Sequence, residues 1–130
     1  MKLIIAGSRH ISVSFDEMDA HILDIVEKMG QKVTGIISGG AKGVDTSARE
    51  YVYELAKFGG NWNDFFHEEL PNWDKHGKAA GPLRNRRMAE MGDVLLVIWD
   101  GKSRGSRSMK NAMEELDKPI FQVIKENPRS

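Results

Sequence analysis

The feature that most constrains the fold is a short apolar run that leads into glycines and then into a helix, at residues 36–45 (IISGGAKGVD). Gly39, Gly40 and Gly43 let the backbone adopt positive φ and approach a ligand closely. The helix that follows would present free N–H groups and the positive end of its dipole. The stretch therefore predicts a phosphate-binding turn. It lacks the third glycine of the dinucleotide fingerprint and the Gly-Lys-Ser/Thr of the P-loop, so a purely architectural turn is the alternative.

Strand and helix patterns alternate along the whole chain of 130 residues, which predicts one domain over 1–130. Short continuous apolar runs are typical of parallel strands covered on both faces, and stripes of period 3.6 indicate the helices between them. Right-handed crossovers then give a three-layer, Rossmann-like, doubly wound parallel α/β sheet of about five strands in the order 3-2-1-4-5. The expected strands are 3–6, 33–38, 65–66, 93–99 and 119–124, the expected helices are 14–29, 44–58, 82–91 and one after 101–106, and a loop is expected through Pro71, Trp73 and Gly77.

Ligands of such folds bind at the carboxyl ends of the strands, where the strand order reverses, here between the first and fourth strands. Four loops rich in glycine, serine or arginine are predicted to meet at this crevice. The candidate ligand-binding residues are Gly7, Ser8, Arg9, Gly39, Gly40, Lys42, Gly43, Asp45, Arg84, Asn85, Asp100, Ser103, Arg104, Gly105 and Ser106.

The charged candidates have specific expected roles. Arg9, Arg84 and Arg104 could grip phosphate oxygens with two parallel hydrogen bonds. Asp45 is either a helix-capping group or a ligand of a ribose hydroxyl, and both interpretations stay open. Lys42 could neutralise a phosphate, although an exposed loop lysine is the more common case. Ser103 and Ser106, at the start of the last helix, could bind phosphate, cap the helix or do both.

The amino-acid composition limits which kinds of partner we expect. Lys plus Arg and Asp plus Glu both number 19, so no global field attracts nucleic acid or a membrane surface, and a nucleic-acid partner is expected to be unlikely. The four histidines lack a metal-ligand spacing, and neither a metal nor a cofactor is expected. The chain has no cysteine, and its apolar opening is too short for a signal peptide, which favours a cytoplasmic location. A homo-oligomer is left open.

Four motifs in order carry a resemblance that covers residues 3–124. They are Ala6-Gly7-Ser8-Arg9, the 38–45 stretch, Trp73 with the 77–85 segment and Met88, and residues 99–106. With them the chain resembles the SLOG superfamily of Rossmann-like proteins, in particular its small stand-alone YspA-like, cpYpsA-related branch. That branch is related to the LOG-type phosphoribohydrolases, the molybdenum-cofactor carrier-like proteins and the DprA DNA-uptake proteins.

The resemblance implies a pocket for a nucleotide or a nucleotide-derived, phosphate-bearing ligand, and a sensor or sequestering protein is the main expectation. LOG-type enzymes cleave nucleotide N-glycosidic bonds with a Pro-Gly-Gly-x-Gly-Thr-x-x-Glu motif, whose proline, double glycine and acid are absent from residues 100–109 here. A hydrolase that uses Asp45 or Asp100 is the alternative. Single-stranded DNA binding in the DprA manner is a weaker alternative, because zero net charge provides no broad basic surface.

Overall fold

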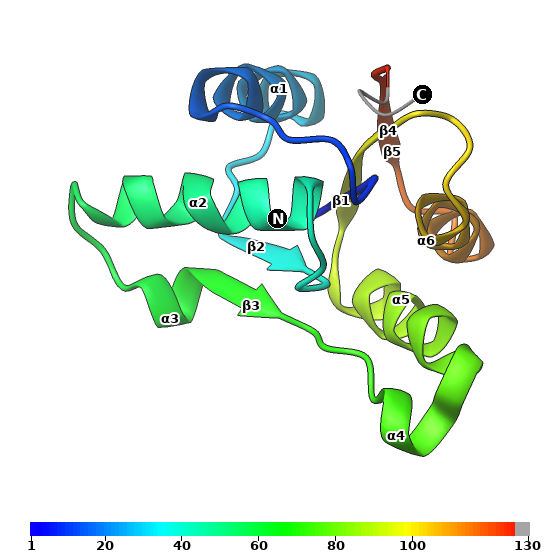
Figure 1. Cartoon of the computed structure of the whole chain (residues 1–130). Coiled ribbons are helices and arrows are strands. Elements are labelled where there is room, and N and C mark those ends of the chain that lie inside the picture. The colour runs from blue at the N-terminus through cyan, green and yellow to red at the C-terminus, as the bar shows by residue number, and fades with distance from the viewer. Residues whose placement is uncertain (127–130) are drawn as a thin grey trace.

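A computed structural model describes residues 1–126 of the chain, and it contains one five-stranded sheet. All neighbouring strands pair in parallel, in the order β3-β2-β1-β4-β5 (Figure 1). This confirms the expected Rossmann-like α/β class and strand order. The strands are β1 (Lys2–Gly7), β2 (Gly35–Ser38), β3 (Phe66–Glu68), β4 (Val94–Trp99) and β5 (Ile120–Ile124).

Helices cover both faces of the sheet. In Figure 1, α1 and α2 lie on one face, and α5 and α6 lie on the other. No helix within residues 1–126 combines the length and the apolar character needed to cross a membrane. The helices are α1 (Phe15–Met29), α2 (Val44–Ala56), α3 (Trp62–Phe65), α4 (Trp73–His76), a 3-10 turn η1 (Gly77–Ala79), α5 (Ala80–Met91) and α6 (Arg104–Glu115).

The side chains of β1 alternate between two hydrophobic clusters, as the pleat of a strand requires. Leu3 and Ile5 pack with Met18 and other residues of α1 and α2, whereas Ile4 packs with Met88 of α5. Leu3, Ile4 and Ile5 are completely buried, and so is every residue of β4 within a few per cent. Burying one such side chain stabilises the fold by roughly 1.5–3 kcal/mol, so these two interior strands anchor the domain.

The start of α1 is fixed to the end of β5. Ser14 Oγ accepts a hydrogen bond from the Glu17 backbone N–H at 3.2 Å, as expected for a helix cap. The Glu17 carboxylate does not complete a capping box, because it accepts a hydrogen bond from Lys125 Nζ at 2.8 Å instead. This contact joins segments from the two ends of the described chain.

The segment between α2 and α5 differs from the expectation. α3 precedes a short β3, α4 and η1 replace the expected loop, and α5 begins two residues before Pro82. The two short helices are stabilised locally, because the Oδ1 atoms of Asn61 and Asn72 accept hydrogen bonds from backbone N–H groups at 3.0 and 3.1 Å. Neither α3 nor α4 contains a buried residue, so the sequence has no apolar stripe from which these helices could be predicted.

We expect Gly7→Ala to lower the free energy of unfolding by roughly 1–3 kcal/mol, because the added methyl group would overpack the site. A Cβ at Gly7 would overlap the carbonyl oxygen of Ile98 and lie 2.7 Å from Val44 Cγ2. Gly105→Ala is the matched control, since a Cβ there meets nothing within 4 Å. Urea denaturation followed by circular dichroism measures both. Equal stabilities of the two variants would contradict the close approach of β1 to β4 and α2.

Candidate functional site

A crevice of about 360 Å³ opens at the carboxyl ends of the strands, beside β1 and β4, where the strand order reverses. Every predicted ligand-binding residue lines it except Gly40, Lys42 and Gly43. Ala41 lines the crevice, whereas the side chain of the next residue, Lys42, is exposed to solvent. The lining residues are Ala6, Gly7, Ser8, Arg9, His10, Gly39, Ala41, Asp45, Arg84, Asn85, Met88, Asp100, Ser103, Arg104, Gly105, Ser106 and Met109. The predicted ligand-binding set did not contain Ala6, His10, Ala41, Met88 and Met109, and all of these except His10 are small or apolar residues that give no chemical signal.

Ser8 joins the segments that form the floor of the crevice. Its N–H donates to the Ile98 carbonyl at 3.1 Å, and its own carbonyl accepts from the N–H groups of Val44 at 3.3 Å and Ile11 at 3.4 Å. Its hydroxyl oxygen accepts from the Asp100 N–H at 3.2 Å. Ser8 is 2% exposed, so this predicted ligand-binding residue acts first as a structural joint between β1, β4 and α2.

Arg84 connects α5 to the loop after β2. Its Nη1 donates to the Gly39 carbonyl at 2.5 Å and lies 3.5 Å from the Glu69 carbonyl, while its Nε donates to Asn85 Oδ1 at 2.9 Å. Burial lowers the pKa of the Arg84 guanidinium below its ordinary value. Much of the donor capacity predicted for phosphate is therefore directed at backbone carbonyls.

Asn85 extends the same connection to α6. Its Nδ2 donates to the Gly105 carbonyl at 3.3 Å and to Ser108 Oγ at 3.2 Å. The side chain is buried, so it fixes the distance between α5 and the N-terminus of α6. Arg84 and Asn85 thus set the width of the crevice.

Asp45 lies in the first turn of α2 and is only 6% exposed. Its Oδ2 accepts the Ala41 N–H at 3.0 Å, which closes the glycine-rich turn, whereas no described residue donates a hydrogen bond to its buried Oδ1. Burial raises the pKa of the Asp45 carboxyl to about 6, although the Ala41 N–H and the charge of Arg84 oppose that shift. The carboxyl is therefore mostly ionised at neutral pH, close to the crevice floor.

The two candidate catalytic carboxylates occupy different parts of the crevice. Asp45 belongs to α2, and Asp100 follows β4, where its Oδ1 accepts the N–H groups of Lys102 at 2.8 Å and Ser103 at 3.0 Å. Asp100 thereby orders the loop that leads into α6. Over residues 1–126 there is no cluster of three or more His, Cys, Asp or Glu side chains suited to a metal ion.

The rim of the crevice is basic and exposed. Arg9, His10 and Arg104 line it, and their side chains face solvent, as does that of Lys102 in the adjoining loop. Ser103 and Ser106 hydrogen-bond to each other through their hydroxyls at 2.7 Å at the start of α6. The cations therefore lie around the opening, and the buried polar groups lie below them.

The charged side chains of α6 are placed opposite to the arrangement that the helix dipole favours. Arg104 and Arg107 occupy its start, Glu114 and Glu115 its end, and its first turn contains no acid. Acidic residues favour a helix N-terminus by about 0.3–1 kcal/mol each, and α1 follows that rule with acids in its first turn. The start of α6 therefore combines free N–H groups with positive side chains, which suits an anion.

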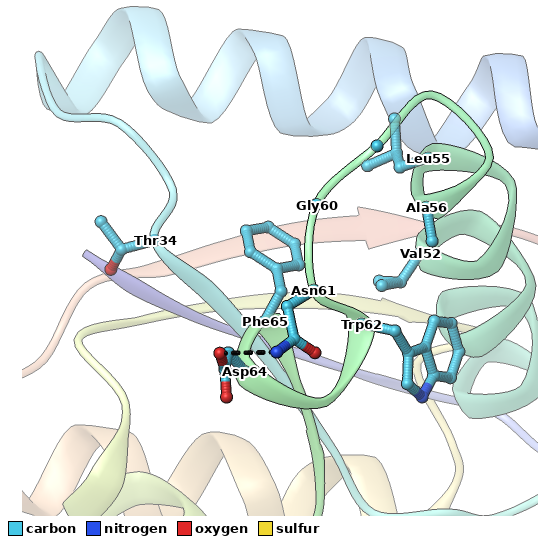
Figure 2. Close-up of a pocket in the computed structure, with 10 residues that line it drawn as sticks. Thr34, Val52, Leu55, Ala56, Gly60, Asn61, Trp62, Asp64 and Phe65 are labelled. Carbon is cyan, nitrogen blue, oxygen red and sulfur yellow. Dashed lines mark hydrogen bonds between the residues drawn. The ribbon is translucent and has the colours of Figure 1, made fainter.

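A second hollow, of about 350 Å³, lies at the opposite end of the sheet, near the amino ends of β2 and β3 (Figure 2). Its walls include Val52, Leu55 and Trp62, and at its edge Asn61 donates a hydrogen bond to Asp64 at 2.9 Å. None of its lining residues is Lys, Arg or His. The basic crevice, rather than this apolar hollow, is therefore the candidate site for a phosphate-bearing ligand.

The chain is similar to a phage protein and to the solved structure of a DNA processing protein. The chain is 36% identical over 90 residues to the Gene 61 protein of Mycobacterium phage D29, a match that covers 68% of each chain. It therefore belongs to the family of that protein. It is also similar to the DNA processing protein A of Helicobacter pylori, described by its single-stranded DNA binding mode, with a TM-score of 0.65 and 21% identity over 98% of this chain and 67% of that one. No protein-family model matches the chain.

Two expectations from the sequence are wrong in the light of these comparisons. A small-molecule sensor was the main expectation, and a nucleic-acid partner was expected to be unlikely. The similar fold along 98% of the chain is that of a protein described as binding single-stranded DNA. The error was to argue against a nucleic-acid partner from the net charge. A net charge of zero does not show where exposed cations lie on the surface.

Replacing Asp45 by Asn should stabilise the protein more at neutral than at acidic pH. The folded carboxyl holds its proton up to a pH of about 6, whereas the unfolded one releases it near the ordinary value of 3.8. The stability that this proton provides is therefore lost as the pH rises through 6, by up to about 3 kcal/mol.

Urea denaturation of both proteins at pH 4.5 and 7.5 measures this difference. The free energy of unfolding of the Asn variant minus that of the wild type should increase with pH. A difference that stays constant would contradict the raised pKa of the Asp45 carboxyl in the folded protein.

Proposed function

We propose that this member of the Gene 61 protein family binds single-stranded DNA at the basic rim of the crevice. The observation that carries the proposal is the collection of exposed cations at the carboxyl ends of a sheet whose fold is similar to that of a single-stranded DNA-binding protein. Charge complementarity to phosphates provides most of the affinity in such complexes.

The phosphates of the strand are assigned to two parts of the rim. Arg9, after β1, and Arg104, at the start of α6, lie on the walls of the same crevice. The N–H groups of the first turn of α6 add directional donors next to Arg104. Lys102 is exposed in the adjoining loop and extends the positive surface.

We further place the chain in the small stand-alone branch of the SLOG superfamily. The four motifs that support this assignment include the loops after β1, β2 and β4, which border the crevice. In this proposal the predicted site residues divide by burial. Ser8, Asn85 and Asp45 shape the crevice, and Arg9 and Arg104 contact the DNA backbone.

The test is fluorescence anisotropy of a labelled 12-nucleotide thymidine strand, titrated with protein at several salt concentrations. The slope of log Kobs against log salt reports the number of phosphate contacts, at roughly 0.7 per contact for single strands. We expect Arg104→Ala to weaken binding and to reduce the slope by about 0.7, because one contact is lost.

Lys57→Ala is the matched control, since Lys57 is also exposed but follows the C-terminus of α2, at the other end of the molecule from the crevice. Its slope should equal that of the wild type. Equal slopes for all three proteins would overturn the assignment of phosphates to the rim. No binding of the strand by the wild type at low salt would overturn the proposed function itself.

A further inference from the structure

Two large apolar side chains are exposed beside the crevice, on the segment that leads from β3 to α5. Leu70 is 62% exposed and Trp73 is 50% exposed, and only Pro71 and Asn72 separate them in the chain. A tryptophan ordinarily contributes its large apolar area to a core or an interface. Tryptophan is enriched at interfaces, so this segment is a candidate for contact with another molecule.

The position of Leu70 ties this pair to the crevice. A Cβ at Gly40 would lie 2.5 Å from Leu70 Cδ2, so the leucine side chain covers the turn after β2. Arg84 spans the same two loops, since its Nη1 donates to the Gly39 carbonyl and lies 3.5 Å from the Glu69 carbonyl. The pair therefore continues the edge of the crevice.

Trp73 lies against the start of α5. Its Cη2 atom would lie 3.5 Å from a Cβ at Gly81, so the indole packs beside the first turn of that helix. Arg84, which reaches the crevice, follows Gly81 by three residues, which is nearly one turn of the helix. The indole and the crevice are thus neighbouring features of the same end of α5.

The backbone that carries both side chains is held firmly. Arg87 Nη2 donates to the Leu70 carbonyl at 3.3 Å, and its Nε donates to Glu69 Oε1 at 3.0 Å. Asn72 Oδ1 caps α4 by accepting the Lys75 N–H at 3.1 Å. A surface fixed in this way loses little conformational entropy when it binds a ligand.

The same segment has positive charge on its surface. Lys75 and Lys78 are exposed on α4 and η1, and Asp74 is exposed beside them. The two acids before Leu70 are paired, Glu68 with Arg49 and Glu69 with Arg87. Aromatic faces next to a basic surface are the chemistry of single-stranded nucleic-acid grooves, where bases stack and phosphates are neutralised.

We propose that Trp73, with Leu70 exposed three residues before it, is a stacking platform for unpaired bases of a DNA strand whose phosphates follow the crevice rim. This inference rests on the proposed function. The platform requires an accessible base face, which duplex DNA hides inside its stack, so it favours a single strand over a duplex.

The experiment compares two labelled strands of equal length, one of thymidines and one of abasic sites, with four proteins. Base stacking on an aromatic side chain provides roughly a tenfold gain in affinity per base. The wild type should therefore bind the thymidine strand about tenfold more tightly. Trp73→Ala should remove that preference, while Trp73→Phe should keep most of it.

Phe58→Ala is the control, because Phe58 is 89% exposed but follows α2 at the opposite end of the molecule. It should retain the wild-type preference. Circular dichroism confirms that each variant is folded, which is expected because Trp73 lies outside the buried core.

The outcomes separate the two proposals. A wild type that binds both strands equally, with a steep dependence on salt, would keep the proposed function and overturn the platform. A preference for bases that survives in Trp73→Ala would overturn the platform as well. A wild type that binds neither strand would overturn both proposals.

Discussion

The hydrogen bonds of Ser8 are the interaction on which the candidate site depends. They join the end of β1 to the end of β4 and to the first turn of α2, three segments far apart in the sequence. This close approach leaves no room for side chains at Gly7 or Gly43, where a Cβ would overlap neighbouring carbonyl groups. Gly7 and Gly43 are therefore required by the backbone packing, whatever ligand the site binds.

Burial divides the polar residues of the site into two groups with different tasks. Asn85 and Asp45 are buried and bind backbone groups, and Arg84 is partly buried and does the same, so these side chains fix the loops in place. Arg9 and Arg104 are exposed, and their charges are available to a ligand. A site whose walls are fixed before binding gives up little free energy to order them.

The sequence was sufficient for the fold because its strong signals are local. The apolar run of β4 and the helical stripe of α1 report burial directly, and both elements form where expected. The hydrogen-bond partners of the side chains could not be predicted in this way, because they depend on contacts between residues far apart in the sequence. The guanidinium of Arg84 meets the Gly39 carbonyl across 45 positions of the chain, and no local pattern indicates that it binds a carbonyl rather than a phosphate.

The proposed binding of a polymer backbone depends on where charge lies in the crevice. Below the opening, the buried Asp45 carboxyl lies close to the oppositely charged guanidinium of Arg84, and both line the crevice. The exposed cations stand around the opening instead, together with the first turn of α6. In the proposed function, phosphates are attracted to these cations, and a strand can place successive phosphates along the rim while its bases stay free to stack outside it.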